Sequence, residues 1–114
     1  MDAERFDELV AEAVKELPDW VREGLDNVEL FVEAEPPLGQ PTLLGLYHGI
    51  PLTRRGNHYS GALPDRITLY RSTLERVSGG DPGALRRHVA HTVEHELAHH
   101  FGISDDRLRE MGKY

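Results

Sequence analysis

The sequence contains no cysteine and no long apolar run, and both absences limit what the chain can be. Without cysteine there is no disulfide, no thiolate metal ligand and no cysteine nucleophile. No stretch of about 18 apolar residues is present that could span a bilayer. The first residues, 1–8, are acidic on balance and lack the basic start followed by an apolar run that is typical of a signal peptide. We therefore expect a cytoplasmic protein with no membrane partner.

Positive charge is also scarce. Thirteen Lys and Arg against twenty Asp and Glu give a formal net charge of -7, which repels phosphate backbones, so we expect no nucleic-acid partner. A composition with 39% hydrophobic and 29% charged residues is typical of a soluble globular protein. A length of 114 residues suits one hydrophobic core, and we expect residues 1–114 to form a single domain.

The spacing of apolar residues predicts helices and strands in an α+β order. Apolar residues three and four apart predict a helix over Ala3–Leu17, followed by a short helical piece over Trp20–Leu25. Alternating or β-branched segments predict three strands, at Val28–Glu33, Thr42–Tyr47 and Arg66–Arg71. A long polar stretch, His48–Pro64, separates the last two strands, and a helical turn is predicted over Ser72–Val77.

A longer helix is predicted from Pro82 to about Phe101. Asp81 can cap its first turn, and proline is favoured at the first helical position. Gly102 stands where glycine commonly ends a helix. A last short helix is predicted over Asp105–Met111.

Five of the seven histidines lie on this predicted helix. At about 100° per residue, one stripe of the helix carries His88, His91, His95 and His99, and another face carries Val89, Ala90, Val93 and Leu97. His95 and His99 are one turn apart and point the same way, so both imidazoles can reach one metal ion.

Glu96 and Asp105 complete a candidate catalytic metal site. Glu96 points about 100° round the helix from His95, which leaves it outside the ligand set and able to reach a water molecule at the metal. A catalytic zinc ion needs a third protein ligand and an open fourth position. Gly102 can adopt the left-handed conformation that turns the chain back and brings Asp105 to the ion.

The run His95-Glu96-x-x-His99-x-x-Gly102-x-x-Asp105 resembles the extended HExxH zinc signature of the metzincin-like peptidases, in the Asp-zincin variant with aspartate as third ligand. The short chain is similar to the small bacterial zincin-like metallopeptidases. The resemblance implies a minimal zincin-like domain, in which a small mixed sheet packs on an N-terminal helix and a C-terminal active-site helix.

The same resemblance implies a function. His95, His99 and Asp105 would bind Zn²⁺, and Glu96 would act as general base and then as general acid in peptide-bond hydrolysis. The partner would be a peptide or protein substrate, held in extended form along the exposed edge of one strand, for which we select Arg66–Arg71. A partner subunit, as in a homodimer, could close the open side of so small a site.

Two other functions remain open. A zincin-shaped protein without catalytic activity could serve as a binding module. A metal-dependent ribonuclease is the other alternative, because a known bacterial RNA-processing family uses two helical histidines four apart, but that pattern lacks a glutamate after the first histidine. For the neighbouring residues the simpler interpretations are preferred: His91 as a solvated histidine, His100 as a core histidine, and Asp106 as a cap or surface charge that could replace Asp105 as ligand.

Overall fold

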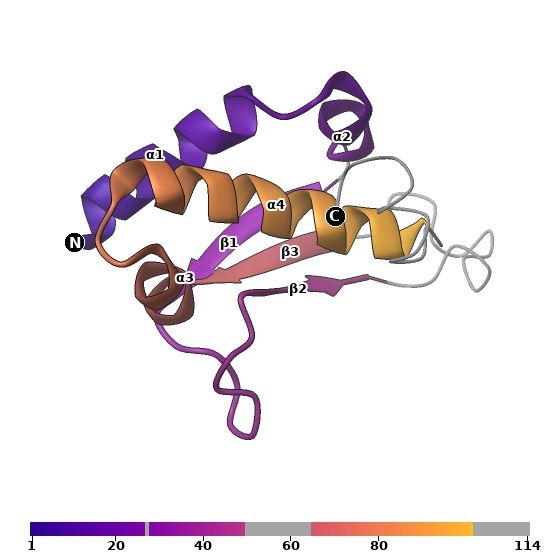
Figure 1. Ribbon diagram of the computed structural model, residues 1–114. Coiled ribbons are helices and arrows are strands. Elements are labelled where there is room, and N and C mark those ends of the chain that lie inside the picture. Colours follow the sequence, from indigo (N-terminus) through magenta and orange to yellow (C-terminus); the bar gives the residue numbers. More distant parts are fainter. Residues whose placement is uncertain (27, 50–64, 102–114) are drawn as a thin grey trace.

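The computed structural model describes residues 1–26, 28–49 and 65–101, which form four helices and one three-stranded sheet. The helices are α1 (Ala3–Lys15), α2 (Asp19–Gly24), α3 (Arg71–Ser78) and α4 (Pro82–His100), and the strands are β1 (Val28–Glu33), β2 (Gly45–His48) and β3 (Asp65–Tyr70). Figure 1 shows α1 and α4 together over one face of the sheet. The expected α+β architecture, a small mixed sheet packed on the first and last long helices, is therefore confirmed. None of the described helices has the length and apolar character needed to cross a membrane.

The sheet has the order β1-β3-β2, so β3 is its central strand. β1 pairs with β3 in parallel, with Leu30 opposite Ile67, and β2 pairs with β3 antiparallel, with Tyr47 opposite Ile67. The prediction that Arg66–Arg71 offers an exposed edge was wrong, because the strand found there is paired on both sides. Among the described residues, the sheet's open edges belong to β1 and β2.

The hydrophobic core lies between the sheet and the two long helices. Buried side chains from three elements meet there: Phe6, Leu9 and Ala13 of α1, Ile67 and Leu69 of β3, and Leu85, Val89, Val93 and Leu97 of α4. Burying a side chain of this size contributes about 1.5–3 kcal/mol. The apolar stripe predicted for α4 is thus the face that packs, and this fixes the histidine stripe on the other side of the helix.

Local signals account for where α4 begins. The Asp81 carboxylate accepts a hydrogen bond of 3.1 Å from the backbone N–H of Ala84, and Pro82 occupies the first helical turn. This is the predicted start. The helix ends at His100, with Phe101 as its C-cap, whereas Gly102 lies outside the described residues.

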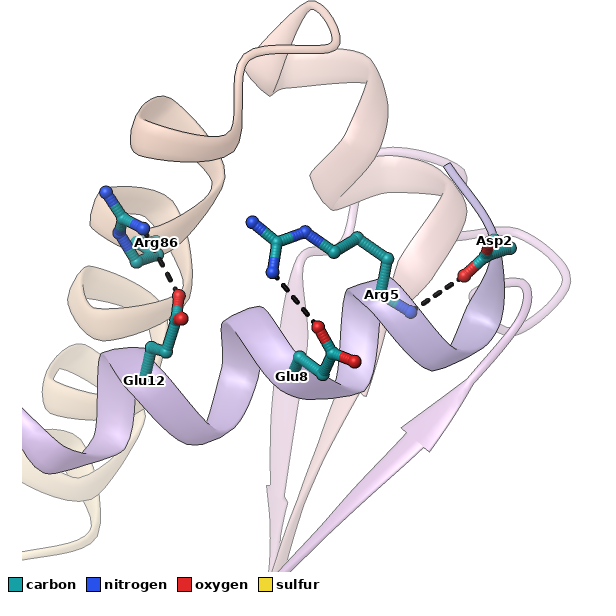
Figure 2. A network of polar contacts seen from close by, with 5 residues as sticks. All are labelled: Asp2, Arg5, Glu8, Glu12 and Arg86. Atoms are coloured by element: carbon teal, nitrogen blue, oxygen red, sulfur yellow. Dashed lines mark hydrogen bonds and ion pairs between the residues drawn. The ribbon is translucent and has the colours of Figure 1, made fainter.

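Ion pairs add little to the packing of α1 on α4. Figure 2 shows Arg86 Nη1 of α4 at 3.2 Å from Glu12 Oε2 of α1, and a second pair, Arg5 with Glu8, within α1. The side chains of Arg86 and Glu12 are 38% and 46% exposed, and such pairs contribute about 0.2–1 kcal/mol. Apolar burial therefore holds these helices together, and the pair only helps to set their register.

Two segments differ from the sequence-based expectation. β2 begins at Gly45 rather than Thr42, because the preceding residues form turns in which Gln40 N–H donates to Pro37 O and Leu43 N–H donates to Gln40 O. The helical turn expected over Ser72–Val77 is a complete helix, α3, which ends where Gly79 adopts a φ of 59°. Glycine takes this left-handed conformation without steric cost.

Candidate metal centre

His95 and His99 lie one turn apart on the last two turns of α4. Their ring centroids are 4.2 Å apart and their ring planes meet at 65°. His95 is half-buried and His99 is exposed. Because the helix presents both imidazoles on one side, one ligand atom from each can face the same point.

Glu96 is the third member of this group. A carboxylate oxygen of Glu96 and one nitrogen from each of His95 and His99 all lie within 4.8 Å of one another. Two imidazole nitrogens and a carboxylate oxygen form a donor set that suits a zinc ion. The residues present therefore fit the metal that the sequence predicts.

The third ligand predicted from the sequence, Asp105, lies outside the described residues, as do Gly102 and the helix expected over Asp105–Met111. The structure thus brings together three of the four predicted site residues. It places Glu96 close enough to the histidine nitrogens to serve either as a base beside the metal or as a ligand itself.

Strand β2 lies directly beside this part of α4. The backbone N–H of Tyr47 donates a 3.1 Å hydrogen bond to Glu96 Oε1. A Cβ atom built on Gly45 would lie 2.7 Å from Cγ2 of Thr92, so only glycine allows the strand to come this close to the helix. Neither contact was indicated by the sequence pattern.

A pocket of about 420 Å³ opens next to Glu96. Its walls are residues 39–45, from the turns before β2 and the first residue of β2, together with Thr92 and Glu96 of α4. The pocket therefore lies where the segment that leads into β2 faces Thr92 and Glu96 of α4.

A second cluster joins the end of α4 to the two neighbouring strands. The Tyr47 hydroxyl donates to Asp65 Oδ2 at 2.8 Å, and His100 Nε2 lies 3.7 Å from the same oxygen. The rings of Tyr47 and His100 stack with centroids 4.1 Å apart and planes 12° apart. The His100 side chain is 11% exposed, so it is largely buried, but it packs against strand residues at the edge of the site rather than in the central core.

Two further residues define the surroundings of the site. The exposed His91 ring lies 5.7 Å from the His95 ring, one turn earlier on α4. Burial raises the pKa of the Tyr70 phenol, and the negative charges of Glu33 and Glu96 raise this pKa further, while Arg66 lowers it. Tyr70 therefore stays neutral at physiological pH.

Comparison with known proteins gives a consistent result. A family described as zincin-like metallopeptidase matches residues 25–113, a span that contains the whole histidine helix. A solved structure of a conserved hypothetical protein from Thermus thermophilus is 33% identical, with a TM-score of 0.58 over 89% of this chain and 94% of that chain. Its description assigns it no activity. The comparison with curated proteins yields no match.

Proposed function

Since the chain belongs to the zincin-like metallopeptidase family, we propose that it is a zinc-dependent hydrolase of peptide bonds. The observation that carries the proposal is that one nitrogen from each of His95 and His99 and a carboxylate oxygen of Glu96 lie within 4.8 Å of one another. The family implies a metal, typically zinc, and these residues supply the nitrogen and oxygen donors that zinc binds.

In the proposed site His95 and His99 hold the zinc ion, and Asp105 supplies the third protein ligand. When bound, the ion makes a water molecule acidic and polarises the carbonyl of the scissile peptide. With these three protein ligands the ion would still have room for a water molecule, as a catalytic zinc site requires.

Glu96 is the proposed proton carrier. It accepts a proton from the attacking water as the new bond between the water oxygen and the carbonyl carbon forms. It then delivers that proton to the leaving amide nitrogen as the bond between carbon and nitrogen breaks. One water molecule is consumed, and the products are a carboxylic acid and an amine.

The free edge of β2 is the proposed place for the substrate backbone, in place of the strand selected from the sequence. Tyr70 N–H donates to Leu44 O, which puts Leu44 in a hydrogen-bonded pair with β3. In an antiparallel ladder hydrogen-bonded and non-bonded pairs alternate, so the backbone groups of Gly45 and Tyr47 point away from β3. The Tyr47 N–H already donates to Glu96 Oε1, so an extended peptide would add there as a further strand through the N–H and carbonyl of Gly45 and the carbonyl of Tyr47, next to Glu96 and the adjoining pocket.

A second candidate function has one observation in its favour. The Glu96 oxygen is near enough to both histidine nitrogens to be a metal ligand. A site in which Glu96 is ligand has no base, and it would then serve a zincin-shaped binding module rather than an enzyme. A ribonuclease is less favoured, because the net charge of -7 repels RNA.

The test is hydrolysis of a mixed peptide library by zinc-loaded wild-type protein, by the Glu96→Ala variant and by wild-type protein with excess chelator. We expect cleavage by the zinc-loaded wild type alone. Equal cleavage by wild type and Glu96→Ala, or cleavage by neither, would remove the peptidase assignment. The same three samples are incubated with single-stranded RNA, and cutting of RNA without cutting of peptides would identify the ribonuclease alternative.

A further inference from the structure

Tyr47 connects the proposed proton carrier to a buried carboxylate outside the metal site. Its backbone N–H donates to Glu96 Oε1 at 3.1 Å, and its hydroxyl donates to Asp65 Oδ2 at 2.8 Å. We propose that Tyr47 and Asp65 are positioning residues, which act through β2 to fix the orientation of the Glu96 carboxylate. This inference rests on the proposed function, in which Glu96 carries the proton.

The first step of the argument is the direction of the Tyr47 backbone. As the ladder with β3 shows, the N–H of Tyr47 points to the open side of β2, where Glu96 lies. A hydrogen bond from a backbone N–H to a carboxylate is charge-assisted and directional, and here it joins the two atoms at 3.1 Å. This hydrogen bond occupies Oε1 of Glu96. Oε2 is then the oxygen that takes the proton from water and gives it to the leaving nitrogen.

The second step is how Tyr47 itself is held. β2 has four residues and is paired only with β3 among the described strands. The hydrogen bonds of the sheet therefore hold it along one edge only. The side chain of Tyr47 adds two restraints: the bond to Asp65 at the start of β3, and the stack on His100 at the end of α4. The stack ties the strand to the helix that carries Glu96, and the bond to Asp65 ties it to β3 beside His100.

The third step is that Asp65 is itself fixed in place. It is buried, and the backbone around it is close-packed, since a Cβ atom on Gly49 would lie 2.6 Å from Asp65 Cγ. A carboxylate confined in this way sets the position of the hydroxyl it accepts from. The contacts therefore run from Asp65, at the start of β3, through Tyr47 to the Glu96 carboxylate.

Tyr47→Phe is the direct test, because it removes the hydroxyl and keeps the ring that stacks on His100. A misplacement of about 1 Å can cost 10²-fold in rate, so we expect kcat for peptide hydrolysis to fall about tenfold, with KM and zinc content unchanged. Asp65→Ala should lower kcat similarly. Asp65→Asn keeps an oxygen acceptor and should restore most of the loss.

Ser72→Ala is the matched control. Ser72 Oγ donates to Glu35 Oε2 at 2.8 Å, a hydroxyl–carboxylate bond of the same length at the start of α3. It should leave kcat unchanged. A second control combines Tyr47→Phe with Glu96→Gln: if Tyr47 acts through Glu96, Tyr47→Phe has no further effect on the residual rate of Glu96→Gln. An unchanged kcat in Tyr47→Phe, or the full tenfold loss again in the Glu96→Gln background, would overturn the proposal.

A measurement without turnover separates this inference from the proposed function. In ¹H–¹⁵N spectra of the full chain, the Tyr47 amide signal should move on Glu96→Gln and on Asp65→Ala, and stay in place on Ser72→Ala. An amide signal indifferent to Glu96→Gln means that the contact does not exist, and the inference fails whatever the activity. If the wild-type protein is inactive but shows the expected amide shifts, the contact exists and the peptidase assignment is wrong. Tyr47 and Asp65 would then position a metal ligand or a binding group, and their proposed role in catalysis would be refuted.

Discussion

Gly45 of β2 lies directly against Thr92 of α4. A Cβ atom on Gly45 would lie 2.7 Å from Thr92 Cγ2 and 3.1 Å from the carbonyl oxygen of Thr68. Thr92 is itself held, because its hydroxyl donates to His88 O at 2.7 Å. Because residue 45 is glycine and has no side chain, the strand can lie this near to Glu96.

Gly45→Ala should destabilise the protein and loosen the Glu96 contact. Overpacking of this kind costs about 1–3 kcal/mol, which urea unfolding measures directly. Adding Thr92→Ser removes Cγ2 but keeps the hydroxyl, so the double variant should regain part of the lost stability. Gly83→Ala is the control, because a Cβ there would meet side-chain atoms at ordinary contact distances, Arg87 Nη1 at 3.5 Å and the Asp81 carboxylate oxygens at 3.8 and 3.9 Å. Equal stability of Gly45→Ala and wild type would show that the strand and the helix are not in close contact.

Asp105→Ala should weaken zinc binding strongly if Asp105 is the third ligand. Loss of a residue that merely supports a ligand costs about 10–100-fold in metal affinity, so loss of a ligand should exceed about 100-fold. Competition with a coloured chelator measures the change. Asp106→Ala is the matched control, one residue further along the chain, and it should bind zinc as the wild type does. If the two variants exchange these results, Asp106 is the ligand.

Tyr70 should make the protein sensitive to alkali. Burial first, and then the charge of Glu33, raises its pKa above 10.0, so the folded protein holds the phenolic proton more tightly than the unfolded chain does. This contribution is fully present below pH 10 and is lost as the pH rises through the folded-state pKa. Between pH 9 and pH 11 the urea midpoint of the wild type should therefore fall more than that of Tyr70→Phe. Parallel losses would show that Tyr70 ionises normally in the folded protein.

Local patterns in the sequence predicted where helices and strands form better than they predicted which strands lie side by side. Val28–Glu33 was recognised because apolar residues alternate before a proline-rich turn, and α4 because Asp81 and Pro82 mark its start. The central place of β3 was not predicted, since alternation shows that one face of a strand is apolar but not which strands pair at its edges. Pairing of β1 with β3 joins segments more than thirty residues apart.

In the site, too, local contacts along one helix were predicted and contacts between elements were not. His95 and His99 were found because the helical period places residues four apart on one side of the helix, and Glu96 because the motif has a glutamate directly after the first histidine. Tyr47, Asp65 and His100 come from three elements, and no spacing in one sequence indicates that they touch. Their roles depend on tertiary packing. The assignment of Asp105 as third ligand stays a prediction, because that residue lies outside the described part of the chain.

The zinc content and zinc affinity of Glu96→Ala, measured beside His95→Ala and His99→Ala, test the central claim most directly. With His95 and His99 as ligands and Glu96 as the proton carrier, Glu96→Ala binds one zinc ion per chain with nearly wild-type affinity, and both histidine variants lose it. If Glu96→Ala loses zinc as the histidine variants do, Glu96 is a ligand and the proposed catalytic mechanism is wrong.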